Sequence, residues 1–420
     1  MTFFLIRNII IGLFAEDTAV KQGMIEADEV FVYPSYRDRR IVLWNGCPPE
    51  PSFTESGMMK ITAVDSFRVE LPLSQEQRQR GYRNTSGITK ISTDEGITGY
   101  GFQEVDVAIV QALLLGRDPF QIERHVEAGL DRWAGAEHAL WDIVGKTAGL
   151  PLHKVMGAYR DKIPLYPTCV WSGAANQTDV TPRQQAEDLA GYAARGYKAV
   201  KIRAWRPDPM DDVEVVRLIR ERVGGREKLE VMVDRTAQYS GVTWDYPTAL
   251  RVANALAAQE ATWLEEPFTR GDIQLHARLR AETALDITGG EHQPPDVYRG
   301  YLQGEAFDIV QPHCALPLST LKKIASMAEL FGVACVFHGS HGLDLVGSLQ
   351  VAATIRTCWT QEVVFTTPPE LPEEAWSPLN VLVKSGTLFV VKDGCVQIPD
   401  APGLGIDLDE EALAFYRVNA

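Results

Sequence analysis

The sequence has no surplus of positive charge and no long apolar run. Its 420 residues include 41 Lys and Arg but 56 Asp and Glu, which gives a formal net charge of −15. Phosphate contacts need a basic face, so this balance argues against nucleic acid as a partner. No stretch reaches the roughly 18–20 apolar residues that span a membrane. We therefore expect neither a nucleic-acid nor a membrane partner, and a cytoplasmic location.

Several motif classes are missing as well. The six cysteines show no CxxC spacing, and we interpret them as reduced core thiols of a cytosolic protein. No GxGxxG or GxxxxGKS/T follows an early strand, which leaves a doubly wound nucleotide-binding sheet as the weaker alternative for the fold.

Residues 1–58 precede the first regular pattern. Arg7 and Asn8 split the apolar run at the start of the chain, so it is only faintly like a signal peptide. A clean strand pattern begins with Met58-Met59-Lys60. We treat 1–58 as an N-terminal extension, which is either an addition outside the folded core or an arm that belongs to it.

Beyond this extension the sequence predicts an α+β unit followed by a barrel. Residues 59–160 show strand patterns and then helical periodicity. Between 161 and 366, apolar or β-branched strands alternate with helical segments at roughly 20–35-residue spacing, which indicates an α/β barrel. The predicted barrel strands are Ile163–Cys169, Ala199–Ala204, Leu229–Asp234, Thr262–Glu266, Leu285–Glu291, Phe307–His313, Val333–His338 and Glu362–Phe365. Residues 367–420 are Pro-rich and then strand-like from Val381 to Ile398, and we expect them to pack on the first unit.

Acidic residues end three successive strands of this barrel. Asp234, Glu265 and Glu291 each stand at a predicted strand end, and barrel enzymes carry their catalytic groups at that end. Three carboxylates at one mouth are hard oxygen ligands of the kind that Mg²⁺ takes. The alternative, three unrelated helix caps or surface acids, is less consistent with three consecutive strands. We therefore predict a magnesium site.

Basic and imidazole side chains end the neighbouring strands. Lys201 and Arg203 lie two apart on one strand, so they share a face. A Lys near a divalent cation has a lowered pKa and can act as a base. His338 ends the seventh strand and is the natural second acid or base. His313 ends the sixth, as a residue that lines the site or is purely structural.

These residues sit within motifs that resemble a known family. From about Met59 onward the chain is similar to the mandelate racemase/muconate lactonizing enzyme branch of the enolase superfamily. The resemblance rests on Ala-Glu-His-Ala-Leu-Trp-Asp-Ile-Val-Gly-Lys at 136–146, Val-Lys-Ile-Arg, Val-Met-Val-Asp, Trp-Leu-Glu-Glu-Pro, Gly-Gly-Glu, Asp-Ile-Val-Gln-Pro, and Ala-Pro-Gly-Leu-Gly-Ile-Asp at 401–407.

The resemblance implies a (β/α)7β TIM-type barrel with an α+β capping domain formed by the N-terminal and C-terminal segments. It implies Mg²⁺ on Asp234, Glu265 and Glu291, and removal of the α-proton of a small-molecule carboxylate by Lys201 or His338. Glu362 matches the acid of the eighth strand that contacts the substrate. The expected reaction is dehydration of a sugar acid; a racemase, epimerase or cycloisomerase, or a non-catalytic binding protein, is the alternative. We also expect a homo-oligomer.

Two positions depart from the family pattern. Arg203 replaces the second lysine of the usual pair and cannot act as a base, so it is expected to bind substrate or to lower the pKa of Lys201. His313 replaces the usual Asp that orients the histidine of the seventh strand. We expect His313 to be the hydrogen-bond partner of His338 and to leave the pKa of His338 lower than an Asp would.

The segment Gln75–Ser86 is a candidate specificity loop or a solvated loop, with Arg83 as its candidate substrate-binding residue.

Overall fold

The computed structural model describes residues 58–79, 82, 84–170, 180–237, 243–340 and 342–418, together with the strands β1 (Val32–Pro34) and β2 (Ile41–Leu43). The chain divides into two compact units, Met1–Met58 and Met59–Ala420. In the first unit, β1 and β2 pair as antiparallel neighbours, with Val32 opposite Leu43.

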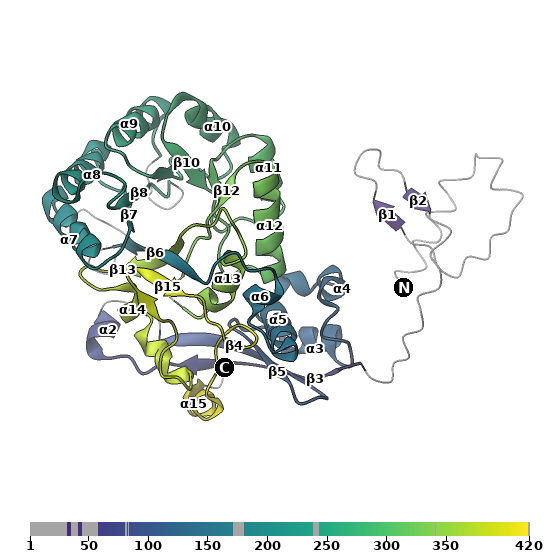
Figure 1. The fold of residues 1–420 in the computed structure, drawn as a ribbon. Coiled ribbons are helices and arrows are strands. Elements are labelled where there is room, and N and C mark those ends of the chain that lie inside the picture. The colour runs from purple at the N-terminus through teal and green to yellow at the C-terminus, as the bar shows by residue number, and fades with distance from the viewer. Residues whose placement is uncertain are drawn as a thin grey trace, which may run out of the picture. The chain divides into compact units, whose positions relative to one another are not determined.

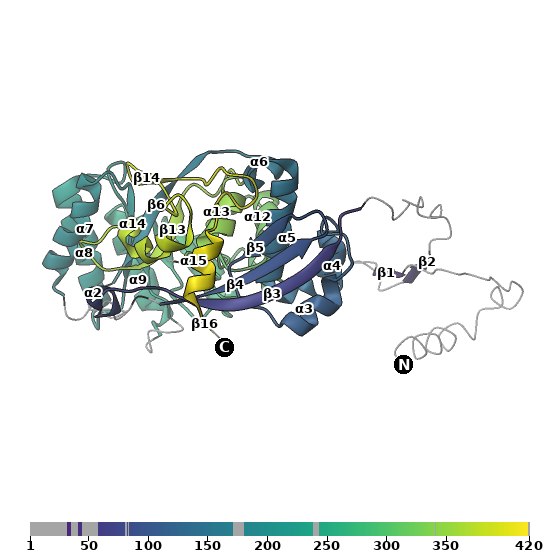
Figure 2. The same cartoon turned by 90° about the horizontal axis from the view of Figure 1, so that it is seen from below.

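The second unit begins with an antiparallel sheet covered by helices (Figure 2). Its strands have the order β16-β3-β4-β5. The elements of this part are β3 (Ile61–Glu70), α2 (Gln75–Gln79), β4 (Thr85–Thr93), β5 (Thr98–Gly101), α3 (Val107–Leu114), α4 (Ile122–Glu127), α5 (Ala134–Ala148) and α6 (Leu152–Val155). A Cβ on Gly101 would lie 1.8 Å from the carbonyl oxygen of Gly135. Only glycine there lets α5 pack directly on the backbone of β5.

Strands and helices alternate from residue 162 onward, and Figure 1 shows helices arranged around the strands. In the described residues the order is β6 (Lys162–Cys169), α7 (Pro182–Ala194), β7 (Ala199–Arg203), α8 (Pro209–Val223), β8 (Glu230–Asp234), α9 (Tyr246–Ala258), β9 (Trp263–Glu265), α10 (Ile273–Glu282), β10 (Asp286–Gly289), α11 (Val297–Gln303), β11 (Ile309–Val310), α12 (Leu318–Leu330), β12 (Ala334–Cys335), α13 (Asp344–Ala352) and β13 (Gln361–Thr366). Each predicted barrel strand has its counterpart here.

The barrel strands are parallel neighbours in chain order. The pairings run β13-β6-β7-β8-β9-β10-β11-β12. In the described part of the chain no strand ladder joins β12 to β13, but the two approach closely beyond Cys335. The Gly339 amide donates to Glu362 Oε2 at 2.9 Å, and a Cβ on Gly339 would lie 2.1 Å from the Glu362 carbonyl oxygen. The architecture is an α/β TIM-type barrel with a capping α+β domain, as predicted.

Side chains alternate along the barrel strands and form two layers. Inward-facing apolar residues make a separate core cluster of six buried residues: Tyr166, Ala199, Met232, Trp263, Ile309 and Val336. The residues two positions further along the same strands are polar: Thr168, Lys201, Asp234, Glu265, Gln311 and His338. Since a strand repeats its side-chain direction every two residues, the polar residues form a second inward-facing layer next to the apolar one, toward the carboxyl ends of the strands.

The C-terminal segment contacts both parts of the second unit. Its elements are α14 (Pro372–Ala375), the 3₁₀ helix η3 (Ser377–Leu382), β14 (Val391–Lys392), β15 (Cys395–Gln397), α15 (Glu410–Tyr416) and β16 (Arg417–Val418). The β14–β15 hairpin pairs with barrel strand β6, whereas β16 pairs with β3 of the cap. The strand-like run predicted from Val381 to Ile398 is therefore strand only near its end.

A buried carboxylate fastens the cap to the barrel. Glu137 of α5 is fully buried and accepts hydrogen bonds from the amides of Leu318 and Ser319 at 2.8 and 2.9 Å. The Ser319 hydroxyl and the Trp141 indole donate to it as well. Helix α12 begins after Pro317, whose side chain makes no capping bond. Glu137 thus satisfies the first amides of a barrel helix from the capping domain.

Two expectations from composition can be compared with the described residues. The five cysteines among them are free, and four are buried: Cys169, Cys314, Cys335 and Cys358. Cys47 lies outside the described residues. Within the described part of the chain, no helix has the length and apolar character needed to cross a membrane.

Candidate active site

The residues predicted for the site lie at the carboxyl ends of the barrel strands. Seven of them are buried: Lys201, Arg203, Asp234, Glu265, Glu291, His338 and Glu362. His313 is half-buried, and Arg83 lies outside the described residues. The register places Arg203 opposite Asp234 and Asp234 opposite Glu265 on successive strands. Consecutive strand ends therefore bring these side chains to one mouth.

Lys201 stands at the centre of a carboxylate cage. Its Nζ lies 2.9 Å from Glu265 Oε2, 2.7 Å from Glu362 Oε1 and 3.7 Å from Asp234 Oδ2. Burial alone lowers the pKa of this ammonium, but attraction by Glu265 and Glu362 raises it well above its usual range. The lowered pKa predicted from sequence presumes a dication beside Lys201 and stays a prediction, because here the carboxylates alone act on the ammonium.

Glu362 connects Lys201 to His338. Its Oε1 contacts Lys201, while its Oε2 lies 3.0 Å from His338 Nδ1. Thr168 donates a short hydrogen bond to the same carboxylate. Burial tends to raise the pKa of Glu362, yet Lys201 and His338 hold it well below its ordinary value. One buried anion thus holds both candidate proton carriers.

His338 is flanked by two carboxylates. Its Nδ1 lies 2.7 Å from Glu291 Oε2 as well as 3.0 Å from Glu362 Oε2. Burial opposes protonation, but the two anions raise the pKa of His338 to about 10. We expected His313 as its hydrogen-bond partner, and this prediction is wrong. The expectation that His313 leaves the pKa of His338 lower than an Asp would stays a prediction. The His313 ring is turned to its own loop, and Glu291 and Glu362 take its place.

The candidate metal ligands do not all meet at one point. Glu265, Glu291 and His338 each offer an atom within 4.8 Å of the others. Asp234 is not in that group; its Oδ2 lies 2.9 Å from Arg203 Nη1. Glu291 also accepts a short hydrogen bond from Arg270. Burial raises the pKa of Glu291, but His338 and Arg270 lower it overall.

The donor set suits a hard divalent cation. Asp234 Oδ2 and Glu291 Oε2 are buried and have no partner in hydrogen-bond geometry within the described residues. Burial, followed by repulsion from Asp234, raises the pKa of Glu265 to about 8. Crowded carboxylates of this kind gain from a dication between them. The residues present therefore fit a hard divalent cation such as Mg²⁺.

Two functional side chains are missing from the predicted set. Arg270 is buried and binds Glu266 through Nε at 2.7 and 2.8 Å as well as Glu291. The spacing of Glu266 and Arg270, four apart beyond a strand, was the available signal. Tyr166 is buried, with its ring centroid 5.7 Å from Lys201 Nζ. Its position on the inward face of the first barrel strand, two residues before Thr168, was the signal by which the sequence could have identified it.

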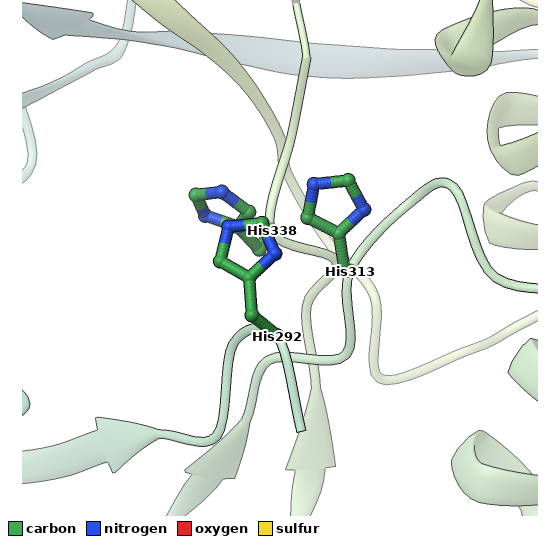
Figure 3. Close-up of side chains that lie close together, drawn as sticks. All are labelled: His292, His313 and His338. Atoms are coloured by element: carbon green, nitrogen blue, oxygen red, sulfur yellow. The ribbon is translucent and has the colours of Figure 1, made fainter. Parts of the chain in front are cut away.

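The imidazoles of His292 and His313 lie beside that of His338 (Figure 3). Their ring centroids are 4.3 Å apart, and each lies 5.1 Å from the ring of His338. His292 has φ of 53°, a left-handed conformation that is strained for a residue with a side chain. Sequence reasoning did not single out His292, although it directly follows Glu291.

A cavity of about 370 Å³ lies between the cap and the end of β12. Tyr82, Ser86 and Glu104 line it from the cap, and Ser340 and Asp344 from the barrel. Ser340 follows His338 by only two residues. The cavity therefore adjoins the mouth in which the candidate catalytic residues lie.

Comparison with known proteins places this geometry in a family. The family described as "Enolase C-terminal domain-like" matches residues 183–412. The D-galactarolactone cycloisomerase of Agrobacterium fabrum is 30% identical over 393 residues, covering 86% of this chain and 99% of the relative. The chain belongs to the enolase superfamily. Its relatives and structural neighbours are of the mandelate racemase/muconate lactonizing enzyme branch, which confirms the resemblance of the motifs.

The relatives within the enolase superfamily are enzymes of more than one class. The arabinonate dehydratase of Saccharolobus solfataricus is 27% identical over 78% of this chain and 90% of its own. The N-succinyl-L-Arg/Lys racemase of Bacillus cereus is 27% identical over 84% and 97%, respectively. The solved structure of D-glucarate dehydratase from Agrobacterium tumefaciens, complexed with magnesium, matches with a TM-score of 0.70 at 23% identity, over 86% of this chain and 99% of that chain. This enolase-superfamily chain is accordingly an enzyme, and its relatives include both lyases and isomerases.

Proposed function

We propose that this enzyme removes the proton next to the carboxylate of a sugar acid in a Mg²⁺-dependent reaction and then eliminates water to give a 2-keto-3-deoxy acid. The observation that carries the proposal is the placement of Lys201 and His338 on the two oxygens of Glu362. Two side chains that can hold a proton, fixed on one buried anion at a barrel mouth, are suited to moving protons at a carbon acid.

Each predicted residue has a role in this proposal. A dication on the neighbouring carboxylates would offset their negative charge and favour neutral Lys201, which then takes the α-proton at Nζ. His338 delivers a proton to the departing hydroxide through Nε2, since its Nδ1 faces carboxylates. Arg203, at the end of β7, and His313, which follows β11, contact the substrate from two separate strand ends. Glu362 contacts it from below while it positions the two proton carriers. Arg83 is the proposed substrate-binding residue of the cap loop.

Asp234, Glu265 and Glu291 are proposed to hold the ion through their carboxylate oxygens. Mg²⁺ bound there would supply Lewis-acid polarisation of the substrate carboxylate. Arg270 then keeps Glu266 and Glu291 in place, because it donates to both.

The relatives support a sugar acid as substrate. They include an arabinonate dehydratase, a D-galactonate dehydratase and an L-talarate/galactarate dehydratase. A racemase, epimerase or cycloisomerase is the second candidate, because the relative with 30% identity is a cycloisomerase. A sugar-acid binding protein without catalysis is the third, and the buried Lys201–Glu362–His338 arrangement argues against it.

The reaction is tested with D-galactonate, D-gluconate, D-arabinonate and galactarate in deuterated water containing Mg²⁺. Dehydration yields a 2-keto-3-deoxy acid, whereas isomerisation yields deuterium at the α-carbon without a new keto group. Absence of both α-exchange and product with every acid, in a folded protein, would refute the proposal.

Further features belong to the same proposal. We infer that the eight parallel strands close into a (β/α)7β barrel, with the extension at 1–58, the cap at 59–160, the barrel at 161–366 and the C-terminal segment at 367–420. A homo-oligomeric state and a cytoplasmic location stay predictions from the sequence.

A further inference from the structure

Three imidazoles converge beside the candidate catalytic residues. His292, His313 and His338 each offer one ring nitrogen, and these three atoms lie within 4.8 Å of one another. Figure 3 shows the three rings gathered in one place. Such a cluster first suggests a borderline metal ion such as Zn²⁺, for which imidazole is a preferred ligand. The hydrogen bond made by one of the three decides against that reading.

His313 uses one ring nitrogen as an acceptor. The amide of Ala315 donates to its Nδ1 at 3.0 Å, so the lone pair of Nδ1 is occupied. A neutral imidazole carries a single proton, which must then be on Nε2. A protonated nitrogen cannot ligate a metal. Figure 3 shows one ring nitrogen of His313 turned toward the other rings and the other turned away.

The surroundings keep His313 neutral and its Nε2 available. Burial, followed by the positive charge of His338 and His292, lowers the pKa of His313 to about 3. In the described residues no hydrogen bond links His313 to the other two rings, whose contacts with it are ring packing at 4.3 and 5.1 Å. The side chain is only half-buried, so a ligand in the mouth can reach the Nε2–H group.

We propose that His313 is a neutral, donor-only contact for an oxygen atom of the substrate, held in its Nε2–H tautomer by Ala315 and packed in place by His292. The inference rests on the proposed function for the identity of that oxygen, a carboxylate or hydroxyl of a sugar acid. A carboxylate at this position, as in the family pattern, can only accept hydrogen bonds and repels an anionic substrate. The imidazole instead attracts it, so His313 determines specificity.

The matched variants His313→Gln and His313→Glu separate donor from acceptor. The two side chains have the same length, and only Gln keeps an N–H near the position of Nε2. With whichever acid of the panel the wild type converts, we expect Gln to stay within roughly fivefold of the wild-type KM. Glu should raise KM roughly 10- to 100-fold, with a smaller change in kcat, as for a lost hydrogen bond to a charged group. Equal losses in both variants would overturn the proposal.

A second measurement does not need turnover. Long-range ¹H–¹⁵N NMR of the full chain at pH 7 should show an Nε2–H imidazole whose signals vanish in His313→Gln. The control is His125→Gln, since His125 lies in α4 of the cap with Nε2 2.8 Å from the Asp118 carbonyl; it should remove only its own signals and leave KM unchanged. An Nδ1–H tautomer at His313, or tight Zn²⁺ binding that His313→Gln abolishes, would overturn the inference in favour of a metal site. If no acid is converted, the proposed function fails while the NMR result still decides the tautomer.

Discussion

Replacing Glu137 by glutamine tests how the cap is fastened to the barrel. The two carboxylate oxygens accept different hydrogen bonds. Oε2 accepts one from the Leu318 amide, and Oε1 accepts from the Ser319 amide, the Ser319 hydroxyl and the Trp141 indole. Glutamine keeps one acceptor oxygen and puts an NH₂ group in place of the other. At least one amide at the start of α12 then faces a donor instead of an acceptor.

The magnitude follows from these contacts. Loss of one hydrogen bond to a charged group costs about 1.5–3 kcal/mol. Loss of negative charge at a helix N-terminus adds about 0.3–1 kcal/mol. The neutral amide is easier to bury, which offsets part of this. We expect the first turn of α12 to open more readily by about 2 kcal/mol, or roughly 30-fold in its opening constant.

Amide hydrogen exchange followed by mass spectrometry measures this opening directly. The peptide covering 316–324 should exchange roughly 30-fold faster in Glu137→Gln, given that exchange scales with the opening constant. Glu123→Gln is the matched control, because Glu123 also reaches α12 from the cap, through Lys323 at 2.6 Å, but both of these side chains are exposed. Such a surface pair contributes little. If both variants leave the peptide as protected as in the wild type, Glu137 is not the cap of this helix.

Three further predictions concern the site and its support. Lys201→Met should abolish α-proton exchange in deuterated water, monitored by NMR, whereas Arg203→Lys should retain part of it; full exchange in the Lys201 variant would contradict its role as base. Asp234→Asn should weaken Mg²⁺ binding in calorimetry by at least 10- to 100-fold, the loss seen when even an outer partner of a metal site is removed, and unchanged affinity would exclude Asp234 as a ligand. His276 is fully buried, and burial lowers its pKa to about 4. The unfolded chain therefore takes up this proton first, and stability falls as the pH drops from about 6.5 to 4, by at most about 1.4 kcal/mol per pH unit. His276→Gln should reduce that slope in urea titrations by up to one proton, and parallel curves would contradict the assignment.

The strands and their polar ends could be predicted because the barrel repeats a simple pattern. Lys201, Asp234 and Glu265 each follow a buried inward-facing residue by two positions, and this alternation is visible in the sequence. The lengths of the strands were harder to predict from the sequence. The sixth strand was predicted as Phe307–His313, but its continuous ladder covers only Ile309–Val310. Pro312 has no amide hydrogen to donate, and pairing resumes as an isolated bridge between His313 and His338.

The partners of individual side chains could not be predicted. The exchange of His313 for Glu291 and Glu362 around His338 depends on a turn in which Ala315 captures the His313 ring. Nothing in the residue pattern encodes that rotation. Arg270 was missed for a related reason, since a long side chain in a loop reaches back across two strand ends.

The pairing of β16 with β3 makes the order of synthesis matter. Val69 of β3 is paired with Arg417, which is translated roughly 350 residues later. At about 5–20 residues per second, β3 remains an edge strand for on the order of 20 to 70 s. Open edges invite pairing with other chains, and charged side chains oppose it. The exposed Arg68 and Glu70 on β3 are charges of the kind that oppose such pairing in the interval before Arg417 and Val418 are made.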